Sequence, residues 1–175
     1  KNTRNLAKYL NLSEDNVWAT DIENWYDIGI DRDKYVKNFV QIKDNKIPLE
    51  DNKFSLVTCF MVLHHVKDLD KAIKEIYRVL KPGGYLFLTE HSAANDYDRM
   101  LIDIQHAFFE LVFRNTDKYK YYSKYYGKYY DRFTWHYIMN KYNLKLTHHD
   151  TKFYSESIRH EVFPTRYFYS VYKKV

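Results

Sequence analysis

Two pairs of residues in this chain combine groups that can transfer protons, and each pair follows an apolar run. The first pair is His64 and His65, and the second is Glu90 and His91. Imidazole titrates near neutral pH and a carboxylate can accept a proton, so both pairs suit general acid–base chemistry. We predict Glu90 and His91 as the catalytic residues, because they leave their strand where a substrate would sit. The alternative for Glu90 and His91 is a cap and a turn contact for the following helix.

Two aspartates also follow predicted strands. Asp21 ends the apolar run 17–21, and a carboxylate at a strand end can accept hydrogen bonds from both hydroxyls of a ribose. Asp21 would equally serve as the amino-terminal cap of a segment that starts at Ile22. Asp44 lies in a polar connection before Pro48, where a surface turn is the alternative, because aspartate and asparagine are common in turns.

These groups require elements that bring strand ends together, and the stretch 54–88 provides such elements. The run 54–66 is too apolar for a half-exposed strand, and 85–88 is again apolar. Between them, 68–80 has helical spacing, and Lys81-Pro82-Gly83-Gly84 ends that helix. A strand, a helix, a tight turn and a strand in this order predict a parallel pair with a crossover helix.

At this point the residues resemble a known family, the class I S-adenosylmethionine-dependent methyltransferases, and in particular domains of methyltransferase type 11. Their pattern L-P-F-x-D-x-x-F-D-x-V, then L-H-H-V, then E-x-x-R-V-L-K-P-G-G is similar to residues 47–84. Upstream, 2–10 resembles the helix after the family's glycine-rich loop, and 17–21 its second strand. The resemblance implies a Rossmann-like α/β fold with a mostly parallel sheet and an antiparallel last strand.

The resemblance also implies that the first strand and the glycine-rich loop precede Lys1. We therefore expect an amino-terminally truncated domain, shortened by about 30 to 50 residues, with an incomplete cofactor pocket at that edge.

The resemblance implies S-adenosyl-L-methionine as the cofactor. In the family an acidic residue at the position of Asp44 contacts the adenine amino group, and the strand end at Phe60 lies near the sulfonium. The histidine pair is largely a structural signature there. The predicted cofactor-binding residues are Asp21, Ile22, Asp44, Asn45, Phe60, Met61 and His64. No metal site is predicted, because no second cluster of histidine, cysteine or carboxylate residues has ligand spacing.

We expect a single domain over 1–175, with 92–143 as a helical insertion, rich in tyrosine and lysine, on the substrate side. The helix over 99–113 has apolar residues at helical intervals, namely Met100, Leu101, Ile104, Ala107, Phe108, Leu111 and Val112. The other expected elements are a short helix and loop over 22–37, a strand over 39–42, a helix over 135–142, and strands over 144–148 and 166–173 that pair antiparallel.

The run 118–130 alternates lysine and tyrosine. If it is helical, its lysines face phosphates from one side while its tyrosines stack on bases from another. The alternative is a structural lid with an exposed basic face. The predicted substrate-binding residues are Tyr122, Tyr126 and His160.

Composition limits the class of protein. The chain has 175 residues, a net charge of +5 and a single cysteine, Cys59. One cysteine cannot form an internal disulfide, so we expect a reducing, intracellular location such as the cytoplasm. No apolar run reaches about eighteen residues, so neither a membrane span nor a visible secretory signal is expected.

We therefore predict methyl transfer from S-adenosylmethionine, with a preference for RNA, as cap or tRNA, because of the basic charge and the abundant tyrosine. One alternative is a small-molecule acceptor such as a quinone or sterol. Another is a catalytically inactive binding or assembly domain. A dehydrogenase-like nucleotide binder fits the Lys81–Gly84 turn less well, and the sequence leaves oligomers and protein partners open.

Overall fold

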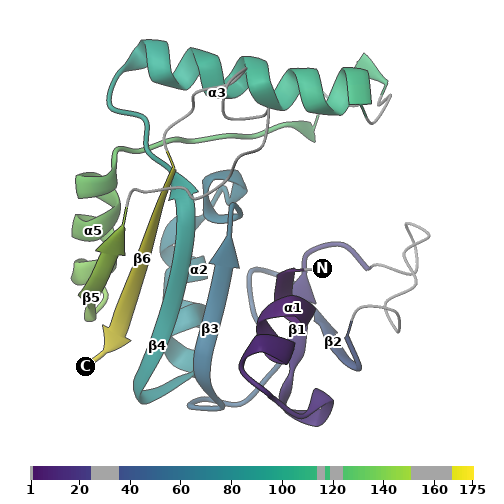
Figure 1. Ribbon diagram of the computed structural model, residues 1–175, viewed down its shortest axis with the longest axis vertical. Coiled ribbons are helices and arrows are strands. Elements are labelled where there is room, and N and C mark those ends of the chain that lie inside the picture. Colours follow the sequence, from purple (N-terminus) through teal and green to yellow (C-terminus); the bar gives the residue numbers. More distant parts are fainter. Residues whose placement is uncertain (1, 25–35, 114–116, 119–123, 151–166) are drawn as a thin grey trace.

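The computed structural model describes residues 2–24, 36–113, 117–118, 124–150 and 167–175, and the statements below concern these residues (Figure 1). The helices are α1 (Asn2–Tyr9), α2 (Leu69–Val79), α3 (Asp96–Phe108) and α5 (Arg132–Lys141). The strands are β1 (Trp18–Asp21), β2 (Asn38–Gln41), β3 (Phe54–Phe60), β4 (Leu80–His91), β5 (Leu144–Asp150) and β6 (Tyr167–Lys174). Short helical turns are η1 (Glu14–Asn16), η3 (Leu63–His65) and η4 (Phe109–Phe113).

The strands form two sheets. One is a parallel pair, and the other has one parallel pair followed by antiparallel strands. β1 pairs in parallel with β2, and β3 pairs in parallel with β4. β6 lies between β4 and β5 and runs antiparallel to both. This arrangement confirms the predicted α/β fold with a mostly parallel sheet and a reversed last strand. The predicted segment 22–37 falls mostly on residues 25–35, which lie outside the described residues.

The predicted strand, helix and strand unit is confirmed as β3, α2 and β4. Asp68 caps α2, with its side chain accepting a hydrogen bond from the Lys71 amide at 3.1 Å. One face of α2 buries Ile73 and Ile76 against the sheet. The core that they join is completed by residues of the strands and of α5, among them Leu80, Leu86, Leu88, Trp135, Met139, Leu144, Phe168 and Tyr172.

The turn between α2 and the main part of β4 requires both of its glycines. Gly83 has a φ of +73°, which side chains disfavour. A Cβ on Gly84 would lie 2.8 Å from the Lys81 carbonyl oxygen and 3.2 Å from that of Phe54. The backbone of β3 therefore passes so close that only glycine fits at position 84.

The predicted helix over 99–113 is confirmed as α3 and η4, but several of its apolar residues are not buried. Met100 and Ile104 are 49% and 50% exposed, whereas Ile102 and Gln105 are buried. The reason is that α3 crosses the carboxyl ends of the central strands instead of lying along a sheet face (Figure 1). There it meets polar groups, and Gln105 Nε2 donates to the Tyr167 hydroxyl at 3.1 Å.

Within the described part of the chain, no helix has the length and apolar character needed to cross a membrane.

Candidate functional site

The ends of β1, β2, β3 and β4 carry most of the predicted site residues. Trp18, the first residue of β1, packs edge to face on Phe54, the first residue of β3, with ring centroids 6.5 Å apart. The two parallel pairs therefore begin at the same side of the molecule. Ligands of open α/β folds bind at the opposite side, beyond the carboxyl ends of the strands.

Asp21 is the last residue of β1 and stands beside Gln41, the last residue of β2. Its carbonyl oxygen accepts a hydrogen bond from the Ile42 amide at 2.7 Å, which extends the parallel ladder past the strand end. Its Oδ1 accepts from the Glu23 amide at 3.2 Å. The side chain is half-buried and adjoins the chain that follows β2, while Ile22 is 68% exposed. The ribose contact predicted for Asp21 stays a prediction.

Asp44 and Asn45 form the centre of a tight turn, which is the alternative that the sequence left open for Asp44. Both have positive φ, of 52° and 59°. Lys43 and Lys46 close the turn by a pair of backbone hydrogen bonds of 3.3 and 2.8 Å. The turn follows β2 directly and is exposed, so it presents a carboxylate close to the strand end that carries Asp21. The adenine contact stays a prediction.

The residues after β3 form a strained turn at the centre of this edge. Phe60 ends β3, and Met61 has a φ of +56°, which is rare for a side chain of this size. The Met61 amide nevertheless donates to the Thr89 carbonyl at 2.8 Å, so the turn stays bound to β4. Strained backbone of this kind is concentrated at functional sites and needs support from its surroundings.

Glu90 provides that support. Its side chain is fully buried, and Oε1 accepts hydrogen bonds from the amides of Val62 and Leu63 at 3.1 and 2.7 Å. Oε2 lies 2.5 Å from Nδ1 of His64, which is also buried. Both oxygens of Glu90 are thus engaged inside the chain, and the carboxylate holds the turn after β3 in place. The catalytic role predicted for Glu90 stays a prediction, but the structure gives the residue a positioning role.

His91 lies within a histidine cluster, by which we mean His64, His65, His91 and His106. The ring centroids of His64 and His91 are 5.0 Å apart, and those of His91 and His106 are 5.3 Å apart. Burial, aided by the neighbouring imidazoles, lowers the pKa of His91 to about 2, and burial lowers that of His106 to about 4. Both rings are therefore neutral at physiological pH. His91 is only 3% exposed, so the side chain predicted to face an acceptor lies inside the cluster.

The segment 124–130 lies along the same edge. The Lys128 amide donates to the His64 carbonyl at 2.8 Å, and the Tyr126 carbonyl oxygen lies 2.7 Å from Nδ1 of His65. Tyr126 is thus near the cluster, although its contact there comes from the backbone. Tyr122 and His160, the other predicted substrate-binding residues, lie outside the described residues.

His106 and Tyr129 also belong to this edge. The sequence did not single out His106, and Tyr129 was considered only as part of the run 118–130 and not as a predicted site residue. The Tyr129 ring packs against His64 with centroids 5.5 Å apart, and its hydroxyl lies 3.3 Å from Nδ1 of His106. The sequence contains one indication of His106. Gln105 and His106 are consecutive polar residues of α3 that do not belong to the apolar pattern of this helix.

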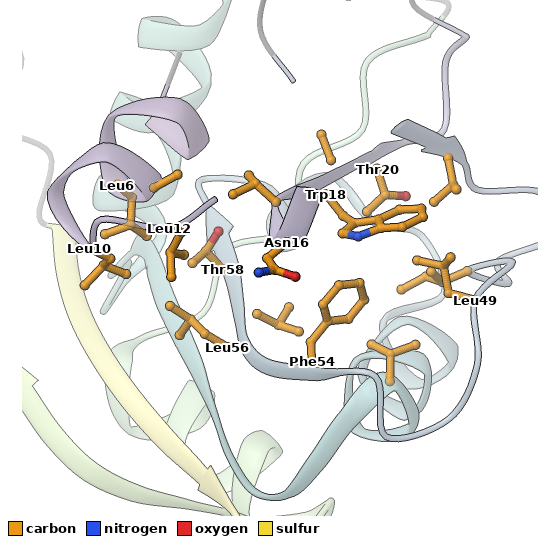
Figure 2. Close-up of a pocket in the computed structure, with 17 residues that line it drawn as sticks. Leu6, Leu10, Leu12, Asn16, Trp18, Thr20, Leu49, Phe54, Leu56 and Thr58 are labelled. Atoms are coloured by element: carbon orange, nitrogen blue, oxygen red, sulfur yellow. The ribbon is translucent and has the colours of Figure 1, made fainter. Parts of the chain in front are cut away.

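An apolar pocket of about 250 Å³ separates β1 from β3 (Figure 2). β1 pairs with β2 and β3 with β4, and among the described residues neither has a strand on the edge that faces this pocket. Figure 2 shows Trp18 and Phe54 on one side of the pocket and leucines of α1 and its following turn on the other. The sequence predicts an incomplete cofactor pocket at this end of the chain, and that stays a prediction.

Arg78 of α2 holds the connection between the Asp44 turn and β3. Its guanidinium donates to the carbonyls of Ile47 and Leu49 at 2.8 and 2.7 Å and to Asp51 at 2.7 Å. Glu75 pairs with the same guanidinium and also accepts from the Ile47 amide at 2.9 Å. The E-x-x-R part of the sequence pattern is thus a clamp on the loop beside the candidate site.

A mostly parallel α/β sheet with a reversed last strand defines a Rossmann-like domain. The comparisons with known proteins identify its family. The profile of the family described as "Methyltransferase domain" matches residues 2–88. The chain carries a class I S-adenosylmethionine-dependent methyltransferase domain, and S-adenosylmethionine is the cofactor of that family.

The similar curated proteins are named ubiquinone/menaquinone biosynthesis C-methyltransferase UbiE. That of Vibrio campbellii is 29% identical over 164 residues, which cover 85% of this chain and 61% of the relative. That of Neisseria meningitidis is 32% identical over 131 residues, which cover 69% and 53%. The chain spans 40% to 61% of the length of these curated relatives.

Solved structures share the fold at low sequence identity. A possible histamine N-methyltransferase from Thermotoga maritima matches with a TM-score of 0.65 and 18% identity, over 99% of this chain and 78% of the other. An S-adenosylmethionine-dependent methyltransferase from Methanosarcina mazei gives 0.63 and 17%, over 95% and 86%. A Haloferax volcanii methyltransferase, solved with its activator Trm112, gives 0.62 and 12%, over 90% and 71%.

Proposed function

We propose that this domain transfers the methyl group of S-adenosylmethionine to a small-molecule acceptor. The observation that carries the proposal is the parallel pairing of β1 with β2, which brings Asp21 and the Asp44 turn to neighbouring strand ends. Two carboxylates at one edge suit a nucleoside, whose ribose hydroxyls and adenine amino group all donate hydrogen bonds.

The donor and acceptor chemistry of these residues fits the nucleoside part of the cofactor. Asp21 is half-buried at the strand end, and a carboxylate at such a position can accept hydrogen bonds from ribose hydroxyls. Asp44 and Asn45 lie on the exposed turn beside it and are the residues that would meet the adenine. When bound, S-adenosylmethionine supplies a methyl group activated by a positively charged sulfur.

The chain's own contribution is mainly alignment, because an in-line displacement depends on the relative position of nucleophile and methyl group. Glu90 holds the turn after β3 through the amides of Val62 and Leu63, and so fixes the position of Phe60 and Met61. Removal of an acceptor proton by Glu90 or His91 is part of the proposal, and it would require a change around His91, because burial lowers the pKa of that imidazole and makes it a weak base.

The comparisons favour a small molecule over the predicted RNA acceptor. The relatives named UbiE are methyltransferases of quinone biosynthesis, and none of the similar proteins described above is named for RNA. α3 and η4 also carry an exposed apolar surface on the side of the helix that faces away from the sheet. This surface, the α3 stripe, consists of Tyr97, Met100, Ile104, Phe108 and Val112, all partly exposed.

The test is transfer of labelled methyl from S-adenosylmethionine by the full-length protein. We expect label in a fraction of quinols and related phenols, and none in total RNA. The Asp21→Ala variant should lose the signal, while Asp15→Ala, an exposed change at the far side of the domain, should keep it. Label in RNA alone would overturn the small-molecule proposal. Binding of S-adenosylhomocysteine without transfer to either fraction would instead support the inactive binding domain.

A further inference from the structure

Three imidazoles from two elements converge at the carboxyl edge of the sheet. His64 and His65 lie in the turn after β3, and His106 comes from α3. One ring nitrogen from each lies within 4.8 Å of the other two. Sequence spacing predicts no metal site, because His106 is far along the chain from the histidine pair. The fold nevertheless gathers the three rings.

Each of these imidazoles already uses Nδ1 for an oxygen acceptor. Nδ1 lies 2.5 Å from Glu90 Oε2 in His64, 2.7 Å from the Tyr126 carbonyl in His65, and 2.9 Å from the Ile102 carbonyl in His106. A carbonyl oxygen only accepts hydrogen bonds, so Nδ1 carries a proton in His65 and His106, and the carboxylate facing His64 favours the same tautomer there. A ring in this tautomer has its lone pair on Nε2.

The Nε2 atom of His64 provides a second, independent observation. It is buried and has no hydrogen-bond partner among the described residues, and the whole residue is 2% exposed. A buried polar atom without a partner is rare in folded proteins and calls for an explanation. Glu90 fixes the orientation of the His64 ring through its contact with Nδ1. Histidines that bind metals show the same arrangement, in which a carboxylate or carbonyl holds one nitrogen and the metal takes the other.

We propose that His64, His65 and His106 bind one divalent zinc ion through their Nε2 atoms, with Glu90 positioning His64. Three neutral imidazoles and an open fourth place are a recognised zinc ligand set. One nitrogen of each ring lies within 4.8 Å of one nitrogen of the other two, and nitrogens around a tetrahedral zinc lie roughly 3.4 Å apart, so the rings would move closer together and turn their Nε2 atoms inward on binding. His65 is exposed and provides the entry route for the ion.

Zinc at this position would join α3 to the turn after β3. The two elements are otherwise linked at this point by ring contacts, with His65 and His106 centroids 5.1 Å apart. The proposal is independent of methyl transfer, because it concerns metal binding by the protein without cofactor or acceptor.

The experiment is a zinc titration of the full-length protein after removal of metals by a chelator, followed by calorimetry and by competition with a chromogenic chelator. We expect one zinc per chain. His65→Gln and His106→Gln should each weaken binding at least tenfold, and Glu90→Gln by about 10- to 100-fold, the usual effect of losing a group that orients a ligand. His148→Gln, at an exposed histidine of β5, should bind as the parent does.

Cobalt substitution gives a readout that a purely structural role would not change. We expect cobalt(II) to give visible absorption bands of a tetrahedral site, and we expect these bands to be absent in His65→Gln. Because His65 is exposed, this variant should keep the fold, which circular dichroism checks, even where Glu90→Gln does not. The proposal is overturned if the parent protein binds no zinc, or if His65→Gln and His106→Gln bind it with parental affinity.

Discussion

Glu90 shows how a single buried residue supports the candidate site. Its carboxylate accepts hydrogen bonds from the amides of Val62 and Leu63 and contacts Nδ1 of His64. If glutamine replaced Glu90, the N–H groups of its side-chain amide would face one of these N–H donors. Loss of a hydrogen bond that involves a buried charge costs about 2 to 3 kcal/mol.

We therefore predict that Glu90→Gln lowers the free energy of unfolding by about 2 to 3 kcal/mol, as measured by chemical denaturation. The matched control is Glu50→Gln, which removes an exposed ion pair with Lys53 and should leave the denaturation midpoint unchanged. Equal midpoints for the two variants would show that the buried contacts of Glu90 contribute nothing.

At the residue scale, sequence reasoning located the strand ends but not the partners of each side chain. Asp21 ends β1 as predicted, because a strand end and the polar residue that follows it are local features. The burial of Glu90 and His91 depends on α3 and on the segment 124–130, which are distant in the sequence. A polar pair after an apolar strand is compatible with either an exposed base or a buried support.

The turn between α2 and β4 is the element that sequence predicts best, since each of its constraints is local. The steric demand at Gly84 adds a contact that only the fold reveals, because a Cβ there would lie 3.2 Å from the carbonyl oxygens of Phe54 and Ser55 in β3, besides 2.8 Å from that of Lys81. We predict that Gly84→Ala lowers the thermal midpoint, at a cost of about 1 to 3 kcal/mol for overpacking. Lys81→Ala, an exposed change in the same turn, is the control. A parental midpoint for Gly84→Ala would refute the close approach of the strands.

The contacts of Arg78 with Glu75 and with the loop before β3 lead to a second prediction at the scale of elements. Lysine cannot reproduce the planar set of donors that Arg78 directs at two carbonyls and two carboxylates. Arg78→Lys should therefore lower the free energy of unfolding by about 1 to 3 kcal/mol, as measured by chemical denaturation. Lys74→Arg, at an exposed position of the same helix, should leave it unchanged.

The same clamp predicts the acid side of the stability profile. The hydrogen bonds from Arg78 hold the pKa of Glu75 below its ordinary value. A lowered pKa in the folded state stabilises the protein above the pKa of the unfolded chain, and the stabilisation is lost as pH falls through the folded value. Thermal midpoints should thus fall below about pH 4.3, and Glu75→Gln should show a shallower fall. Parallel acid profiles for the two proteins would contradict this assignment.

The helix α3 shows where sequence patterns fail at this scale. Its apolar residues lie at helical spacing as predicted, yet Met100 and Ile104 are half exposed. Periodicity reports that a helix has an apolar face but not that the face meets the core. Here the helix crosses the strand ends, so polar residues such as Gln105 and His106 face the protein while the α3 stripe does not.

For the whole molecule, the sequence predicts the order of the helices and strands, but it does not predict that the strands divide into two sheets. Local patterns identified the strands, but pairing between them depends on what lies on each edge. β1 and β3 face each other across the apolar pocket of Figure 2, and no described strand joins them. A parallel strand in this pocket would pair with both edges and unite the two sheets.

The central claim is that Asp21 and Asp44 hold the adenosine of the cofactor at neighbouring strand ends. Calorimetric titration of the full-length protein with S-adenosylhomocysteine tests it most directly. We predict binding with one site per chain, weakened by about 1 to 3 kcal/mol, or roughly 5- to 150-fold, in Asp21→Ala and in Asp44→Ala, and unchanged in Asp15→Ala. Parental affinity in both site variants, or no binding by the parent protein, would contradict the account.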